Sequence, residues 1–143
     1  MVNPSSPSPE DVAEDLRQAV GHFVRRTRAQ DGTGGGRTAV LGHLGRQGPT
    51  SIADLAAVEQ VRHQSMARTV QLLVAAGHAQ TRPDPTDGRR VLVEATPAGI
   101  DQLAAERRRR SAWIAEAITT CLDDADQAAL AALPRILRRL ADG

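Results

Sequence analysis

Apolar residues recur along most of the chain at intervals of three and four, which is the spacing of one face of an α-helix. Ser8 followed by Pro9 predicts a helix start, because serine caps a helix and proline suits its first turn. The apolar stripe behind them predicts a first helix of roughly twenty residues. A second helix is expected at about 37–47. The glycine-rich stretch 31–36 between them is expected to be a flexible connector, since it lacks the pattern of a phosphate-binding loop.

A pair of short helices joined by a tight turn is predicted next. Gly48-Pro49 ends the second helix, and Ser51 with Asp54 three residues later forms a capping-box pattern for a short third helix. After a brief break, a fourth helix is expected over about 62–76. No good capping residue precedes that fourth helix. With their apolar faces turned inward, such a pair is typical of a helix-turn-helix, whose second helix fits the major groove of DNA.

A two-stranded hairpin is predicted behind the helix pair. The stretches 78–82 and 91–93 are its strands, and between them PDPTDG is dense in turn-forming residues. The two prolines exclude a helix there. Asp87-Gly88 favours the positive φ of a tight hairpin tip. We therefore expect a wing with a charged tip.

The C-terminal third is predicted to be helical. Thr96-Pro97 repeats the cap-then-proline start, and the helix can run to about Cys121. Asp123 starts a last helix, in which Pro134 is expected to cause a kink or a split. Four leucines in this helix have a 3-4-3 spacing that suits a partner helix. They are Leu130, Leu133, Leu137 and Leu140.

These elements predict a mainly α fold: a winged helix-turn-helix with a small β-hairpin wing and with N- and C-terminal dimerisation helices. The expected organisation is a disordered tail over 1–8, a dimerisation helix with its connector over 9–36, a winged helix-turn-helix DNA-binding domain over 37–96, and dimerisation helices over 97–143. At 143 residues the chain is long enough to bury a core without disulfide or metal.

Composition narrows the function classes. Cys121 is the only cysteine, which excludes an internal disulfide and a multi-cysteine zinc site, and the four histidines lack paired ligand spacing. We expect no metal and no cofactor. There is no membrane-length apolar run and no signal-peptide pattern, so the cytoplasm is expected and no membrane partner. All 18 basic residues are arginine and the net charge is only +1, so phosphate binding would depend on how arginines are placed locally.

The outward face of the fourth helix is the first candidate DNA-binding surface. Arginine can pair with guanine and glutamine with adenine, while serine and histidine can bond phosphates or bases. An ordinary solvated polar face is the alternative. The candidate residues are Arg62, His63, Gln64, Ser65, Arg68 and Gln71, with Ser51 at the start of the preceding helix.

The wing tip is the second candidate surface. Arg89 and Arg90 follow a constrained turn, and a guanidinium presented there can enter a narrow minor groove. Asp87 is expected to brace Arg89 by a salt bridge and is counted with the DNA-binding residues. A solvated charged hairpin is again the alternative.

Residues 50–99 resemble the MarR family of bacterial winged-helix regulators. The matching residues are Ala53-Asp54-Leu55-Ala56, Arg68, Leu73, Gly77, Arg82, Asp84-Pro85, Asp87, Arg89, Thr96 and Gly99. The resemblance implies a homodimer with interleaved terminal helices that binds a near-palindromic double-stranded DNA operator. It also implies DNA contact by Arg68, minor-groove contact by Arg89, and Asp87 holding Arg89. Relatives in the family often bind small phenolic or anionic effectors between the dimerisation helices and the DNA-binding domain.

Two further groups of residues are assigned on weaker patterns. Arg107 to Arg110 span a full helical turn, so at least one is expected to face the cleft under the DNA-binding domain. With His22, Arg107 and Arg110 are the candidate contacts of a small anionic or aromatic effector; intersubunit ion pairing is the alternative. Cys121 is expected to be a buried structural residue, with a redox sensor as the alternative.

The chain is therefore expected to be a sequence-specific transcriptional regulator, most simply a ligand-responsive repressor. A winged-helix module that binds another protein is the alternative. An enzyme is the weakest option, since no nucleophile–base pair, carboxylate pair or metal cluster stands at suggestive spacing.

Overall fold

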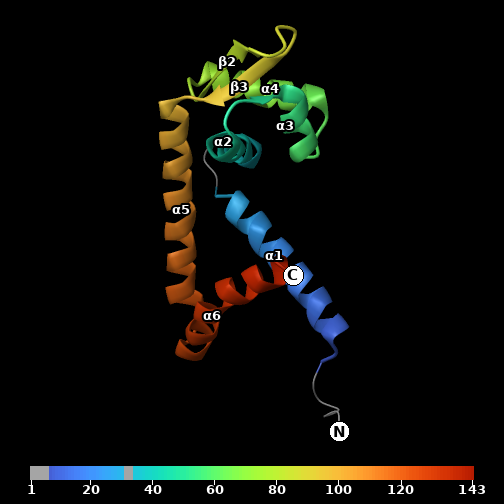
Figure 1. Cartoon of the computed structure of the whole chain (residues 1–143). Helices are drawn as coiled ribbons and strands as arrows, with labels where there is room; N and C mark the ends of the chain where they lie inside the picture. Colours follow the sequence, from blue (N-terminus) through green and yellow to red (C-terminus); the bar gives the residue numbers. More distant parts are fainter. Residues whose placement is uncertain (1–6, 31–33) are drawn as a thin grey trace.

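The computed structural model describes residues 7–30 and 34–143, and over these residues the fold is mainly helical, with a small antiparallel sheet. In chain order the elements are α1 (Pro9–Arg28), α2 (Gly35–Gln47), β1 (Thr50–Ser51), α3 (Ile52–Val58), α4 (His63–Ala75), β2 (Ala79–Pro83), β3 (Val91–Ala95), α5 (Pro97–Cys121) and α6 (Asp124–Ala141). Figure 1 shows a head built from α2, α3, α4 and the sheet, from which α1 and α5 extend toward α6. The predicted winged helix-turn-helix fold is confirmed.

The buried core lies almost entirely in the head. Leu41, Leu55, Leu73 and Val93 are each at most 1% exposed, and they come from α2, α3, α4 and β3. Leu103 of α5 closes the core from the side of the long helix. Fully burying an aliphatic side chain of this kind contributes about 1.5–3 kcal/mol, so these contacts fix the angle between α3 and α4.

The sheet has three strands, in the order β1-β3-β2, where the sequence predicted two. The extra strand is Thr50–Ser51, which pairs antiparallel with β3 in the register Thr50↔Val93 and Ser51↔Leu92. Two residues are too few to show the alternation of a strand, so no sequence pattern could reveal it. The pairing ties the start of α3 directly to the wing.

The predicted helix starts are confirmed by their caps. The side chains of Ser8, Ser51, Thr96 and Asp123 each accept a hydrogen bond from the backbone amide three residues later. At α4 the N-cap is Arg62, which makes no side-chain cap, as its sequence predicted. Gly77, with φ of 73°, ends α4 in the left-handed conformation that glycine tolerates best.

Three boundaries differ from the sequence prediction. Of the expected connector, residues 31–33 lie outside the described residues, as do the first six positions of the expected tail, while Gly35 and Gly36 already belong to α2. Burial of Val40 and Leu41 on the same helix offsets the low helix propensity of those glycines. Pro134 does not split α6, which runs through it without a break. Its position is exposed, where water can satisfy the carbonyl that loses its amide partner.

The C-terminal end of α4 is joined to the start of α5 by two hydrogen bonds from Thr96, which also caps α5. The Thr96 hydroxyl donates to the carbonyl of Gly77 at 2.6 Å and accepts from the Gly99 amide at 3.1 Å, and the Thr96 amide donates to the carbonyl of His78 at 3.1 Å. A Cβ at Gly99 would overlap the His78 carbonyl oxygen. This joint sets the direction in which α5 leaves the head.

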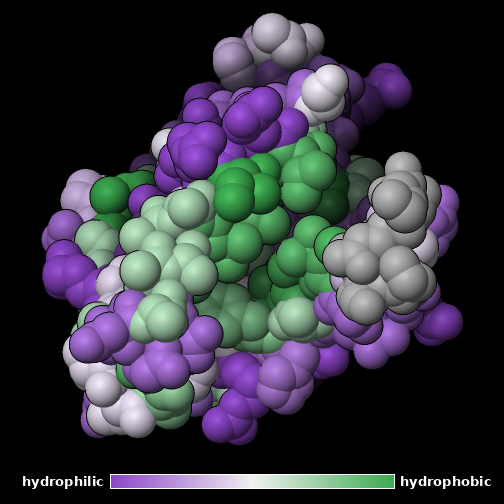
Figure 2. Space-filling view, turned by 90° about the horizontal axis from the view of Figure 1, so that it is seen from below, coloured by the Kyte–Doolittle hydropathy of each residue, from purple (hydrophilic) through white to green (hydrophobic). Residues whose placement is uncertain are grey.

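Outside the head, α1 and α6 contribute no apolar residue to the core. Phe23 is 48% exposed and Leu140 is 64% exposed, although both helices are amphipathic. Figure 2 shows the consequence from below: a broad hollowed apolar area bordered by polar residues. None of the helices in the described part of the chain combines the length and apolarity needed to cross a bilayer.

Candidate nucleic-acid interface

Helix α4 presents one buried and one exposed face. Met66, Val70 and Leu73 are at most 3% exposed and pack into the core, which turns the opposite face to solvent. The predicted contact residues on and before this helix are all exposed: Arg62, His63, Gln64, Ser65, Arg68 and Gln71. A rigid helix with a polar outer face and an apolar inner face is the arrangement that a recognition helix requires.

The wing tip is held by its own backbone and short polar side chains. The Arg90 amide donates to the Asp87 carbonyl at 2.9 Å, and the Asp84 amide donates to the Arg90 carbonyl at the same distance. The Asp84 carboxylate accepts the amide and hydroxyl of Thr86 at 2.8 and 2.7 Å. These bonds, the amide first, lower the pKa of Asp84 below its usual value. The tip is therefore ordered without any apolar packing.

Two predictions about the tip are wrong in detail. Gly88 does not have positive φ. The strands are joined by the longer loop 84–90, which the Asp84–Arg90 bond closes, and the Asp87–Arg90 bond forms a β-turn within it. Asp87 does not pair with the Arg89 guanidinium in the described structure. Its carboxylate accepts the Arg89 backbone amide at 3.1 Å instead. The Arg89 side chain is exposed, and the described residues offer it no ion pair.

Arg90 differs from its neighbour, because its guanidinium binds two residues at the start of α3, in a contact at the surface of the protein. One nitrogen, Nη2, donates to the Ser51 hydroxyl at 3.0 Å and to the Asp54 carboxylate at 2.7 Å. The pKa of Asp54 lies below its usual value, first because the Ser51 hydroxyl donates to it and then because Arg90 is near. Ser51 is only 6% exposed, so its hydroxyl serves this cluster and the α3 cap rather than standing free for DNA as expected.

A second polar cluster, missed by sequence reasoning, braces the two wing strands. Glu94 accepts hydrogen bonds from Gln80 at 2.7 Å and from Arg82 at 3.2 Å. Gln80 lies directly opposite Glu94 in the strand register, which is where cross-strand pairs interact. Both bonds lower the pKa of Glu94, that from Gln80 more. Gln80 and Arg82 lie on the same face of β2, and Glu94 lies opposite Gln80 on β3. The sequence would predict this cluster only if the pairing of the two strands were already known.

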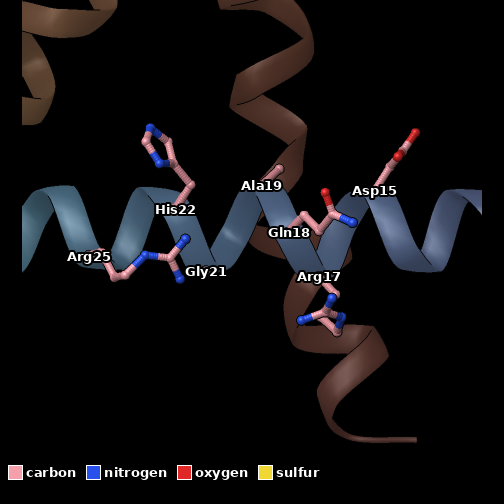
Figure 3. A pocket seen from close by; sticks show the side chains of 7 residues that line it. All are labelled: Asp15, Arg17, Gln18, Ala19, Gly21, His22 and Arg25. Carbon is pink, nitrogen blue, oxygen red and sulfur yellow. The ribbon is translucent and has the colours of Figure 1, made fainter.

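The three candidate effector residues are not brought together. Arg107 and Arg110 line a cavity of about 310 Å³ between α2, α5 and the end of α1, which confirms that part of the Arg107–Arg110 run faces the cleft under the head. His22 lies elsewhere, on an exposed stretch of α1. It lines a shallow pocket whose lining residues all come from that one helix (Figure 3). Sequence reasoning missed two arginines from other helices, Arg28 and Arg46, which complete the lining of the cavity.

Arg109, in the same run, is bound to a buried carboxylate. It forms an ion pair at 3.2 Å with Glu106, a carboxylate only 1% exposed that also accepts a hydrogen bond from Gln102. The expected burial of Cys121 is not met in the single chain, where this residue is exposed beside an apolar groove. No group of three potential metal ligands exists within 7–30 and 34–143.

The fold and the exposed helix beside a hairpin that carries arginines at its tip define a winged helix-turn-helix protein. A profile described as MarR family matches residues 32–90. An uncharacterized HTH-type transcriptional regulator of Mycobacterium leprae is 33% identical over 116 residues, covering 79% of this chain and 81% of that protein. The chain belongs to the MarR family of transcriptional regulators, DNA-binding proteins rather than enzymes.

Solved structures agree with this assignment. A transcriptional regulator from Pseudomonas aeruginosa superimposes with a TM-score of 0.77 at 29% identity, covering 96% of this chain and 99% of that one. An S. aureus MepR mutant bound to an oligodeoxyribonucleotide has the same fold, with a TM-score of 0.63 at 16% identity and coverage of 90% and 97%.

Proposed function

We propose that this regulator is a homodimeric, ligand-responsive repressor that reads a near-palindromic operator with α4 and the wing. The observation that carries the proposal is the exposed polar face of α4, held rigidly by the buried Met66, Val70 and Leu73. The wing adds an exposed guanidinium at Arg89. The MepR mutant of the same fold is solved with an oligodeoxyribonucleotide, which supports the same use of the head here.

The candidate contacts divide into two kinds. Arg68 and Gln71 stand on the outer face of α4, where their side chains can bond base edges in the major groove. Arg62, His63, Gln64 and Ser65 lie at the first turn of α4, whose backbone amides no side chain caps, and there they can bond phosphates as well as bases. Arg89 is assigned to the minor groove beside the recognition helix.

A homodimer is supported by the uncovered apolar surface on the underside (Figure 2). A groove of about 250 Å³ is lined by residues of three helices, including Phe23 of α1, Ile118 of α5 and Leu130 of α6. Of the four leucines predicted to meet a partner helix, none is buried in the single chain. A second copy would cover this surface and place two α4 helices about 34–36 Å apart, one turn of DNA.

The test is selection of bound fragments from the source genome, followed by footprinting with the intact dimer. Paired protections with a two-fold symmetric consensus are expected. Affinity should also fall steeply as salt is raised, because phosphate contacts release counterions. An intact dimer that enriches no fragment would overturn the proposal and favour the protein-binding alternative. Occupancy of a promoter would explain repression by exclusion of polymerase, and the proposed function implies a cytoplasmic location.

Ligand response is assigned to the cavity between α2 and α5. Four arginines and one glutamate, Glu59, line it, so it suits a small anion. A ligand bound there touches both the head and the long helix, and it would shift the dimer toward a spacing of α4 helices that no longer fits the operator.

Benzoate and inorganic phosphate are suitable first probes of this cavity. A rise in melting temperature that is lost in Arg46→Ala but kept in Arg108→Ala would support it, since Arg108 does not line the cavity. Equal shifts in both variants would reject the cavity as the binding site.

A further inference from the structure

Arg90 joins the wing tip to the start of α3, and its side chain lines a cavity there. A cavity of about 220 Å³ lies between the wing root and the helices, lined by Arg90 and Val91 on one side and by Ile52, Ala53 and His63 on the other. Apolar packing therefore does not hold the tip against the head. The β1–β3 ladder ends at Ser51↔Leu92 and does not reach Arg90, and the β2–β3 ladder lies within the wing, so neither ladder holds the tip against the head.

The anchor that Arg90 contacts is itself rigid. Ser51 is a strand residue of β1 and the N-cap of α3, and its hydroxyl accepts the Asp54 amide at 3.1 Å. Helix α3 is fixed to α4 through the core, where Leu55 is fully buried and Met66 is 3% exposed. A side chain that binds Ser51 and Asp54 is thereby fixed relative to the recognition helix.

We propose that Arg90 is a positioning residue for DNA binding: it locks the wing tip to the N-terminal end of α3, and so fixes where Arg89 stands relative to α4. This inference rests on the proposed DNA-binding function. The backbone of Arg90 supports the same role, because its amide binds the Asp87 carbonyl and its carbonyl accepts the Asp84 amide, which closes the tip. Of the ion pairs in the described part of the chain, Arg90–Asp54 is the one that joins the wing to a helix.

A direct phosphate contact by Arg90 is the competing role, and the two roles predict different changes in DNA affinity when Asp54 is neutralised. If Arg90 acts through Asp54, then Asp54→Asn weakens DNA binding. If Arg90 binds phosphate, the same change frees its guanidinium and removes a negative charge near the DNA, so binding stays equal or tightens. Asp54→Asn keeps the α3 cap, which uses the Asp54 backbone amide.

The experiment measures dissociation constants of the full chain for a labelled duplex, recovered by selection on the wild-type protein from a randomised pool. Asp54→Asn and Arg90→Gln are each expected to weaken binding about five- to tenfold, and the double variant no more than either, as for residues acting as one unit. In an Arg89→Ala background, Asp54→Asn should have no further effect. The matched control is Glu94→Gln, which neutralises a wing carboxylate whose partners, Gln80 and Arg82, lie within the wing.

Melting temperatures of all variants are measured alongside, and the Arg89→Ala background separates positioning from general destabilisation. Asp54→Asn that binds as tightly as wild type, or additive losses in the double variant, would overturn the positioning role. A further loss on top of Arg89→Ala would overturn it too. A wild-type protein that recovers no duplex would instead sink the proposed function, so the two failures are distinguishable.

Discussion

At the scale of single residues, the two wing-tip arginines differ in what their side chains contact. Arg90 is engaged by Ser51 and Asp54, whereas the side chain of Arg89 is exposed with no ion pair in the described structure. A guanidinium without an ion pair in the protein can enter a minor groove without breaking one. Arg89 is therefore the tip residue expected to contact DNA.

Replacing Arg89 with Ala should weaken operator binding by about 1–3 kcal/mol and leave the melting temperature unchanged. The reason is that the substitution removes a DNA contact and no internal one. Fluorescence anisotropy titration with the selected duplex measures it, with Arg108→Ala as the control on α5. Equal affinity of the Arg89→Ala variant and wild type would remove the wing from the interface.

The Glu94 cluster gives a pH prediction. Hydrogen bonds from Gln80 and Arg82 depress the pKa of Glu94 in the folded protein, so the carboxylate stabilises the fold above its ordinary pKa of 4.5. That contribution is lost as pH falls through the depressed folded pKa. Wild type should exceed Glu94→Gln in free energy of unfolding at neutral pH, and the two should converge in acid. Chemical denaturation at several pH values tests this, and a difference independent of pH would contradict it.

Residue roles were predictable from sequence where they depend on local spacing alone. Ser8, Thr96 and Asp123 were identified as caps, because a cap acts on the amide three residues later. The partner of Arg90 was not identified, because Asp54 lies 36 positions away and meets it only after the sheet has formed. The Asp87 carboxylate was assigned the wrong bond partner, since spacing alone cannot distinguish a backbone amide from a guanidinium.

At the scale of elements, the joint between α4 and α5 couples the proposed recognition helix to the proposed dimerisation helix. Its tightest point is Gly99, where α5 begins against the carbonyl of His78. That carbonyl also accepts the Thr96 amide. Any added atom at Gly99 must therefore separate the two helices or break the bond.

Gly99→Ala should destabilise the protein by about 2–4 kcal/mol, the range for overpacking with loss of a buried hydrogen bond. Gly88→Ala is the control, since a Cβ there meets no atom within 4 Å and the backbone has negative φ. Its effect should stay within about 0.5 kcal/mol. The free energy of unfolding is measured by urea denaturation. A similar decrease in the two variants would show that a Cβ at Gly99 does not clash with the His78 carbonyl.

Elements were predictable where apolar periodicity is long. The spans of α1, α4, α5 and α6 agree with the expected ranges to within a few residues. Strand β1 was missed because pairing with β3, rather than its own two residues, makes it a strand. The glycines at the start of α2 were assigned to a connector because local propensity was outweighed by the burial of the helix they begin.

At the scale of the whole molecule, the chain combines a head with its own core and three helices that leave apolar surface uncovered. The head core includes Leu41, Leu55 and Leu73, whereas α6 has no buried residue. An amphipathic helix gains most of its stability by packing its apolar face, and in the proposed homodimer a second copy would cover the apolar faces of α1 and α6.

Ile118→Glu should therefore produce a folded head that no longer dimerises. Ile118 lines the apolar groove of α1, α5 and α6, and burying an unpaired carboxylate at such an interface costs several kcal/mol. Analytical ultracentrifugation should report monomer for the variant and dimer for wild type. Operator affinity should fall by more than a hundredfold, because each half-site is then bound without the other.

The control is Val58→Glu, which places the same charge at an apolar residue of the head that is 56% exposed and outside the groove. It should leave both the dimer and the affinity intact. A variant Ile118→Glu that still sediments as a dimer would move the interface away from this groove. A monomer with undiminished affinity would mean that one head suffices for the site, and the two-fold operator would then lose its structural basis.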